Sequence, residues 1–513
     1  MSKVWKILAV LLAVTALVWL STLWRWESSQ FDPGSADLVL NLALLPLALT
    51  AGLVFTVWAV RRLRRYAAAP VALPAAAGPG APATASGDAA LLAPQRPRAK
   101  VLVAAVQLRA GTEWRSVQQA IGQGDCKADL DPDIKDDEGV AVFTAAMPEL
   151  DTEAVAAEAA VLVQAWAAST PDAWAHYEPP VEALRALTLL RDVLAELAEP
   201  LEAQWPALAP VASPNRAAPM PPEVSVRVGI PAQWSAQTQR LATAWIEAQV
   251  APLLSAARAA ALGEHPNPRA QTSAVQLHVH PMEHAEALWQ HGERQLQLWL
   301  NQKQAGLLVL VGADSGVSEL AVAELAARQE LFSGANPRGR VPGEGAGALV
   351  WATPDWPELP GAEPPLCWLQ SARVMRRDKS ADALGRVGPT TMVNVATDAA
   401  VASGWSLEAV AHLTSDADQR GSRASELFEA VQSALPHLDA TQDVLRLGVG
   451  CGDLGLARLL ACAGLSARQV QQSEAPVMVL GALPAFERFA LLLTPTAEPA
   501  SDPKPAAAAA AAA

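Results

Sequence analysis

Cysteines and clusters of basic residues are scarce in this chain of 513 residues, and each scarcity excludes a class of protein. The four cysteines lie far apart, and none forms a CxxC pair or a Cys/His cluster with zinc-ligand spacing. We therefore expect free thiols in a reducing compartment. The net charge is −14, and the one dense arginine cluster is at residues 61–65. Because a nucleic-acid surface needs a concentrated basic patch, we expect no nucleic-acid partner.

Two long, uncharged apolar runs occupy residues 7–24 and 38–60. At about 1.5 Å rise per residue, each is long enough to cross a hydrocarbon core of roughly 30 Å. A cleaved signal peptide is the alternative for the first run, but it needs small residues at its end, and Trp24-Arg25-Trp26 follow instead. The sequence predicts two transmembrane helices. Tryptophans, which favour the membrane interface, lie toward their ends at Trp19, Trp24, Trp26 and Trp58.

Charges beside these runs indicate their orientation. Lys3 and Lys6 precede the first run, four arginines at residues 61–65 follow the second, and the short loop between the runs is acidic. Because positive flanks stay on the cytoplasmic side, we expect a protein with two spans in a bacterial inner membrane and both termini in the cytoplasm. The lipid bilayer is then its first partner.

The rest of the chain divides by composition. Residues 1–66 form the predicted anchor, 67–99 an Ala/Pro-rich linker, and 495–513 a disordered Pro/Ala tail. Residues 100–494 alternate strand-like apolar runs with helical stretches, which predicts an α/β fold. The Pro-rich segment 200–223 is either a surface excursion or a boundary, so it stays open whether residues 100–222 belong to the same domain.

Specific elements follow from the periodicity of apolar residues. We expect strands at 100–108, 224–229, 275–279 and 306–312. We expect helices at 111–122, 150–168, 182–197, 232–262, 282–302, 317–330 and 378–384. The alternation of strands and helices continues with segments 347–352, 406–413, 423–435, 445–450, 454–465, 476–481 and 489–493.

Two glycine-containing stretches resemble β-ketoacyl synthases of the thiolase-like superfamily. Residues 305–314 (AGLLVLVGAD) read as a strand that ends in a Gly-Ala-Asp turn, and PGEGAG follows after a helix at residues 342–347. In that family, a strand with such a turn leads to a strand entered through GEGAG. A weaker similarity is GCGDLG at 450–455, where the family has a Gly-His turn before a helix. The resemblance implies a layered α/β/α thiolase-like domain over residues 100–494. Its motif residues are Gly312, Asp314, Gly343, Glu344, Gly345, Gly347, Gly452 and Gly455.

The catalytic residues of the resembled family are mostly missing. Its synthases use a cysteine nucleophile at a helix N-terminus. The corresponding helix is expected at residues 282–302, but no cysteine lies between Cys126 and Cys367. Two histidines complete the family's site. His412, in AHLTSD, is either a relic of the first or an ordinary histidine at a strand end, and Asp453 stands where the second would fall. The resemblance therefore implies a degenerate site, with His412 and Asp453 as its vestigial candidates.

Two other clusters suggest metal binding. His278, His280 and His284 are close in sequence, and the first two would point the same way on a strand. However, Pro281 separates them from His284, so we interpret the three as polar residues lining a vestigial pocket. The acidic run at residues 125–137 lacks the central glycine and terminal glutamate of a calcium loop, and we interpret it as a solvated loop. We expect no metal and no cofactor.

These observations favour a non-catalytic, thiolase-like scaffold or docking component of an inner-membrane assembly, such as secretion or envelope machinery. The resemblance implies a homodimer or a heterodimer with a relative, and protein partners in the membrane complex. The alternative is a membrane-bound enzyme acting on acyl-thioesters, or a binder of acyl chains. A thiol beside His412 would favour that alternative.

Overall fold

The computed structural model describes residues 19, 98–136, 138–209, 220–262 and 275–496. The chain divides into two units, Met1–Ala93 and Pro94–Ala513, and the named helices and strands all belong to the second. Both predicted membrane segments, apart from Trp19, and almost all of the linker and tail lie outside the described residues. Within the described ranges, no helix combines the length and apolarity that a membrane span requires.

One mixed sheet of eleven strands organises the second unit. Its first half contains five strands, which are β1 (Ala99–Leu108), β4 (Glu223–Pro231), β5 (Val275–Met282), β6 (Gly306–Ser315) and β7 (Glu344–Ala352). Most side chains of β4, β6 and β7 are buried. The other strands are β8 (Cys367–Leu369), β9 (Arg373–Arg376), β10 (His412–Ser415), β11 (Val444–Arg446), β12 (Val477–Gly481) and β13 (Glu487–Thr494).

The two halves of the sheet have the same topology. The first half runs β1-β7-β6-β4-β5 and the second runs β8-β13-β12-β10-β11. In both halves the fifth strand in chain order pairs antiparallel with the first and the fourth. In both, the second strand pairs parallel with the third and the fourth. β1 and β8 pair antiparallel and join the halves, so the domain contains an internal duplication.

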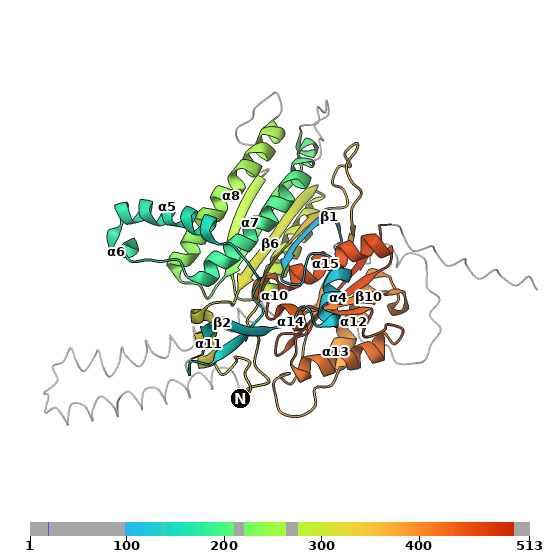
Figure 1. Ribbon diagram of the computed structural model, residues 1–513. Coiled ribbons are helices and arrows are strands. Elements are labelled where there is room, and N and C mark those ends of the chain that lie inside the picture. The colour runs from blue at the N-terminus through green and yellow to red at the C-terminus, as the bar shows by residue number, and fades with distance from the viewer. Residues whose placement is uncertain (1–18, 20–97, 137, 210–219, 263–274, 497–513) are drawn as a thin grey trace, which may run out of the picture. The chain divides into compact units, whose positions relative to one another are not determined.

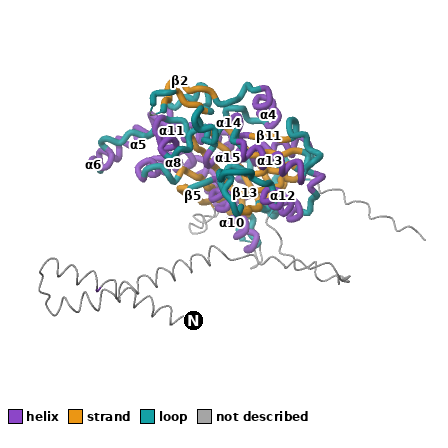
Figure 2. The backbone as a smooth tube through the Cα atoms, turned by 90° about the horizontal axis from the view of Figure 1, so that it is seen from below, coloured by secondary structure: helices purple, strands orange, loops and turns teal. Residues whose placement is uncertain are grey.

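Two helices occupy the centre of the domain between the half-sheets. α10 (Ala285–Gln302) and α15 (Arg458–Ser473) share one apolar core with residues of β6 and β7 from one half and of β12 and β13 from the other. Figure 2 shows α15 near the middle of the domain. α15 is buried from Arg458 to Val470 except for Arg468, which is half-buried.

Outer helices cover the remaining faces. α7 (Val181–Glu202) and α8 (Ala236–Leu262) share a second core with β4, β6 and β7. α12 (Thr390–Ser403) and α13 (Gly421–Ala434) share a third with β10, β12 and β13. The domain therefore has five layers, three of helices alternating with two of strands (Figure 1). The expected layered α/β class is confirmed.

Smaller elements connect these layers. α5 (Glu153–Ser169) and α6 (Pro171–Trp174) extend from one side of the domain (Figure 1). β2 (Asp129–Lys135) and β3 (Ala141–Thr144) form a separate two-stranded sheet. The others are α4 (Trp114–Gln123), η3 (Trp205–Leu208), α11 (Glu319–Ala327), η4 (Leu407–Ala409), α14 (Leu447–Cys451) and η5 (Gly455–Ala457).

The structure differs from the sequence-based expectations at four places. The acidic run at 125–137 contains strand β2, which pairs antiparallel with β3, and Thr144 of β3 donates a hydrogen bond to Asp131. The helix expected at 378–384 is a series of turns, and α12 was not expected at all. α7 continues through Pro200 to Glu202, so the Pro-rich segment begins inside a helix.

The start of β7 shows why the PGEGAG sequence needs its glycines. A Cβ atom on Gly343 would lie 2.1 Å from the carbonyl oxygen of Cys451, and neighbouring Pro342 forms a bridge with Asp453. Two loops of the domain thus approach each other backbone to backbone, which only glycine permits. This contact fixes the loop of Gly452–Gly455 against the ends of β6 and β7.

Candidate functional site

A cleft of about 790 Å³ lies beside the N-terminus of α10. Four segments that are distant in sequence line its floor. They are the end of β6 with Asp314, the start of α10 with His284, the loop with Asp453 and Gly455, and residues 483–485 before β13. α11 and the residues around Tyr177 form its walls.

No thiol stands at the N-terminus of α10. His284 is the N-cap, and its Nδ1 accepts a hydrogen bond of 3.1 Å from the backbone amide of Ala287. The four cysteines of the chain are all buried, and none lines the cleft. A hydrogen bond with Cys126, together with burial, raises the pKa of Cys451, and burial raises the pKa of Cys462.

A buried chain of three charges lies directly behind this helix terminus. Arg458, the first residue of α15, makes ion pairs with Glu286 of α10 and with Asp416 after β10. All three side chains are at most 6% exposed. Burial alone would raise the pKa of Glu286, but the adjacent Arg458 guanidinium outweighs burial and lowers it. Asp416 also accepts hydrogen bonds from the backbone amides of Ala482 and Leu483.

His412 does not reach the cleft. It is the first residue of β10, whereas the family motif would place it at the carboxyl end of a strand. Asp416, four residues later, follows the carboxyl end of β10. His412 packs against the Trp114 ring at 5.0 Å and lies 3.6 Å from Asp443. Burial lowers the pKa of His412.

Asp314 and Asp453 do meet in the cleft. The carboxylate of Asp314 accepts hydrogen bonds of 3.0 Å from the backbone amides of Ser315 and Leu456. Burial raises the pKa of Asp314 to about 7, and the negative charges of Asp453 and Glu182 add to the effect. Gly455 has a φ of +50°, and a Cβ on it would lie 2.0 Å from the Asp314 carboxylate. Glycine is therefore required where the loop crosses this side chain.

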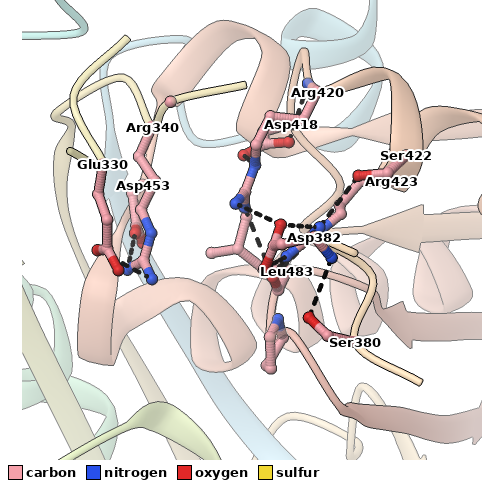
Figure 3. Close-up of polar contacts among 12 residues, drawn as sticks. Glu330, Arg340, Ser380, Asp382, Asp418, Arg420, Ser422, Arg423, Asp453 and Leu483 are labelled. Atoms are coloured by element: carbon pink, nitrogen blue, oxygen red, sulfur yellow. Dashed lines mark hydrogen bonds and ion pairs between the residues drawn. The ribbon is translucent and has the colours of Figure 1, made fainter. Parts of the chain in front are cut away.

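A network of arginines and acids borders the cleft (Figure 3). Arg340 lies between Glu330 and Asp453, at 3.4 Å from each carboxylate. On its other side, a second cavity of about 620 Å³ is lined by Arg338, Arg386 and Arg420 among others. Next to it, Asp382 pairs with Arg420 and Arg423, and Arg423 also donates to the carbonyl oxygen of Leu483. These contacts hold the loop that contains Asp382 against the loop that contains Leu483.

Glu344 of the PGEGAG sequence is fully buried, and its hydrogen bonds give it a structural role. Arg185 of α7 donates to both of its carboxylate oxygens, and Ser315 and the amide of Met147 complete its contacts. The carboxylate thus ties α7, β6 and the segment after β3 to the start of β7. Nothing in this arrangement leaves Glu344 free for a reaction.

The three histidines proposed as metal candidates are not all brought together. His278 and His280 stack on the edge strand β5 with ring centroids 5.7 Å apart, and His291 of α10 lies 5.3 Å from His280. His284 instead caps α10. Burial, with neighbouring Arg227, lowers the pKa of His278 and His280. In the described part of the chain, no group of three or more His, Cys, Asp or Glu has metal-binding geometry.

Sequence reasoning missed the residues that fill the site: Glu286, Asp416, Arg458 and Arg340. One signal was present, because Arg458 interrupts the otherwise apolar run LGLARLLACAG. A charged residue within a buried helix is unfavourable unless it is paired, so this arginine predicts acidic partners elsewhere in the fold.

Comparisons with known proteins find similarity to solved structures only. The chain matches no protein-family model and no curated protein. A β-ketoacyl synthase from Burkholderia phymatum is 13% identical, with a TM-score of 0.47. The ishigamide ketosynthase/chain length factor is 12% identical, with a TM-score of 0.48. In both cases the match covers 78% of this chain and 100% of the other. At these identities and TM-scores, the matches by themselves say nothing about activity.

The buried charge chain yields a stability prediction. Arg458→Leu leaves Glu286 and Asp416 buried without their cation, so we expect it to lower the free energy of unfolding by about 3–5 kcal/mol. Denaturant unfolding of the full-length protein measures this change. The control is Arg386→Leu, which removes an exposed pair with Glu429 and should leave stability nearly unchanged. Equal effects of the two substitutions would contradict the assigned role.

Asp314 yields a pH prediction. Its pKa is raised from 3.8 to about 7. Between these pH values the folded state therefore holds a proton that the unfolded state has lost. Stability from this group is therefore present below pH 4 and is lost as the pH rises toward 7. As the pH rises between these limits, the free energy of unfolding of the wild type should fall on the order of a few kcal/mol relative to that of Asp314→Asn. Urea unfolding at several pH values tests this. A difference that does not vary with pH would refute it, and exposed Asp125→Asn is the control.

Proposed function

We propose that this protein is a non-catalytic, thiolase-like scaffold or docking component of a bacterial inner-membrane assembly. One observation carries the proposal. Where the resembled family has its nucleophile, at the N-terminus of α10, this chain has a capping histidine backed by the Glu286–Arg458–Asp416 chain.

The chemistry of acyl transfer supports this proposal. A covalent route needs a nucleophile, and thiols react as thiolates. Cys367, Cys451 and Cys462 are buried, and their pKa values are raised, so the thiolate is disfavoured in each. Cys451 contacts Cys126, and His412 contacts Trp114 and Asp443. The pairing of a thiol with His412, which would favour an acyl-thioester enzyme, is not among these contacts.

The thiolase-like part of the proposal rests on the placement of the motifs. The Gly-Ala-Asp turn ends β6, the PGEGAG sequence enters β7, and the GCGDLG loop precedes α15, so the three motifs converge on one cleft. Their residues now support the structure. Gly343 and Gly455 permit close contacts, and Glu344 joins four segments. A scaffold that kept its packing motifs while its nucleophile disappeared would have this pattern.

Assembly through the edge of the sheet fits a docking role. β5 ends the sheet and pairs on one side with β4. Five consecutive residues of β5, from Gln276 to His280, are half-buried, as expected for a strand whose outer edge is accessible. A homodimer, or a heterodimer with a relative, would form there by strand pairing.

Turnover tests the non-catalytic part of the proposal. Full-length protein incubated with a panel of acyl-thioesters should release thiol no faster than buffer alone. The variants His412→Ala and Cys451→Ser should behave identically to the wild type. Thiol release that either substitution abolishes would establish an acyl-thioester enzyme and refute the scaffold.

Selective labelling tests the membrane part. Because the four native cysteines are buried, a membrane-impermeant maleimide should react little with the folded wild type. Ser29→Cys, in the loop between the apolar runs, should be labelled on intact cells after permeabilisation of the outer membrane. Ser86→Cys, in the predicted linker, should be labelled only after lysis of the inner membrane. Labelling of both in intact cells would contradict the proposed orientation.

A further inference from the structure

More acidic than basic side chains line the cleft beside α10. Seven of its lining side chains are aspartate or glutamate, and three are arginine. All three arginines already have carboxylate partners. Arg458 pairs with Glu286 and Asp416, Arg340 with Glu330 and Asp453, and Arg328 with Glu324. The remaining acids of the cleft have no cation from this set.

Glu182 is the acid whose environment is least explained by the fold. It lies in the first turn of α7, is only 8% exposed, and lines the cleft. In the described part of the chain, no cation and no hydrogen-bond donor contacts its carboxylate. Its charge instead acts on Asp314 and Tyr177, and it contributes to the raised pKa of both. Asp314 is the buried partner in this arrangement, and a positive group bound between it and Glu182 would favour its ionised form.

Apolar side chains also line the cleft. They are Leu320 and Leu325 of α11, Leu483 and Pro484, and the rings of Tyr177 and Trp234. Leu320 is 56% exposed, which is unusual for a leucine beside a cavity. The cleft thus presents carboxylates next to an apolar surface, and its volume of about 790 Å³ lies within the range of small-molecule sites.

We propose that this cleft binds an organic cation, namely an ammonium or guanidinium group carried on an apolar chain. The positive group would lie between Glu182 and Asp314, where it would balance the charge of Glu182 and of Asp314 in its ionised form, and donate hydrogen bonds to both. The apolar chain would lie along Leu320 and Leu325. A bare metal ion fits less well, because no three of the described ligand-type side chains have metal-binding geometry. The proposal holds whether or not the protein is a scaffold.

Such a cation has two sources with the same chemistry. It is either a free amine or guanidine, or a lysine or arginine side chain presented by a partner protein. Two probes distinguish them: n-butylguanidinium as the free cation, and the peptide acetyl-Leu-Leu-Arg-Leu-Leu-amide as the side chain in a protein segment. The neutral counterparts are n-butylurea and the same peptide with glutamine in place of arginine.

Calorimetric titration of the full-length protein tests the proposal. At least one cationic probe should bind saturably and its neutral counterpart should not. Glu182→Gln should weaken binding about tenfold through loss of one charge-assisted contact. Glu199→Gln, an exposed position on the same helix, should leave binding unchanged. Leu320→Ser, which removes an exposed apolar contact without disturbing the core, should weaken binding several-fold.

The outcomes separate the alternatives. Binding of n-butylguanidinium supports a free cation as ligand, and binding of the arginine peptide alone supports a partner side chain. Glu182→Gln preserves the shape of the side chain and removes an unpaired charge, so it should fold, and thermal unfolding verifies this. The proposal is overturned if neither cation binds, if the neutral probes bind equally, or if folded Glu182→Gln binds as tightly as the wild type.

Discussion

Arg458 is the cation around which the centre of the domain is arranged. Its guanidinium pairs with Glu286 of α10 and with Asp416 at the end of β10, and it is itself the first residue of α15. One side chain therefore connects both central helices to the second half-sheet. Because each charge would be strongly disfavoured alone in this interior, the three must remain together. Their pairing fixes the position of the α10 N-terminus and so defines the floor of the cleft.

The cleft follows from the duplicated topology. Each half-sheet has its own outer helices, and the halves meet through α10, α15 and the pairing of β1 with β8. The end of β6 comes from one half, whereas Asp416 and residues 483–485 come from the other. The shape of a site built between two similar halves depends on the packing of those halves. The glycine contacts at Gly343 and Gly455 and the buried Glu344 are such packing features.

Much of the fold could be predicted from the sequence, because it depends on local pattern. β1, β6 and β7 were placed within three residues of their observed bounds by their apolar runs. The duplication was not predicted, because the two halves share strand order rather than a sequence repeat. The charge chain was also missed, because Glu286, Asp416 and Arg458 are far apart in sequence. His412 begins β10, and a short motif does not by itself indicate which end of a strand it occupies.

The position of β1 constrains the order of events when the chain folds. Leu108 pairs with Gly345 and Lys100 with Ala352, so the first strand of the domain finds its partner only after β7 exists. Its other neighbour, β8, comes later still. Nascent β1, whose side chains are mostly apolar, must wait unpaired while the intervening helices and strands are synthesised. These long-range pairings raise the contact order of the domain, and they leave β1 as an apolar segment that needs protection from aggregation during synthesis.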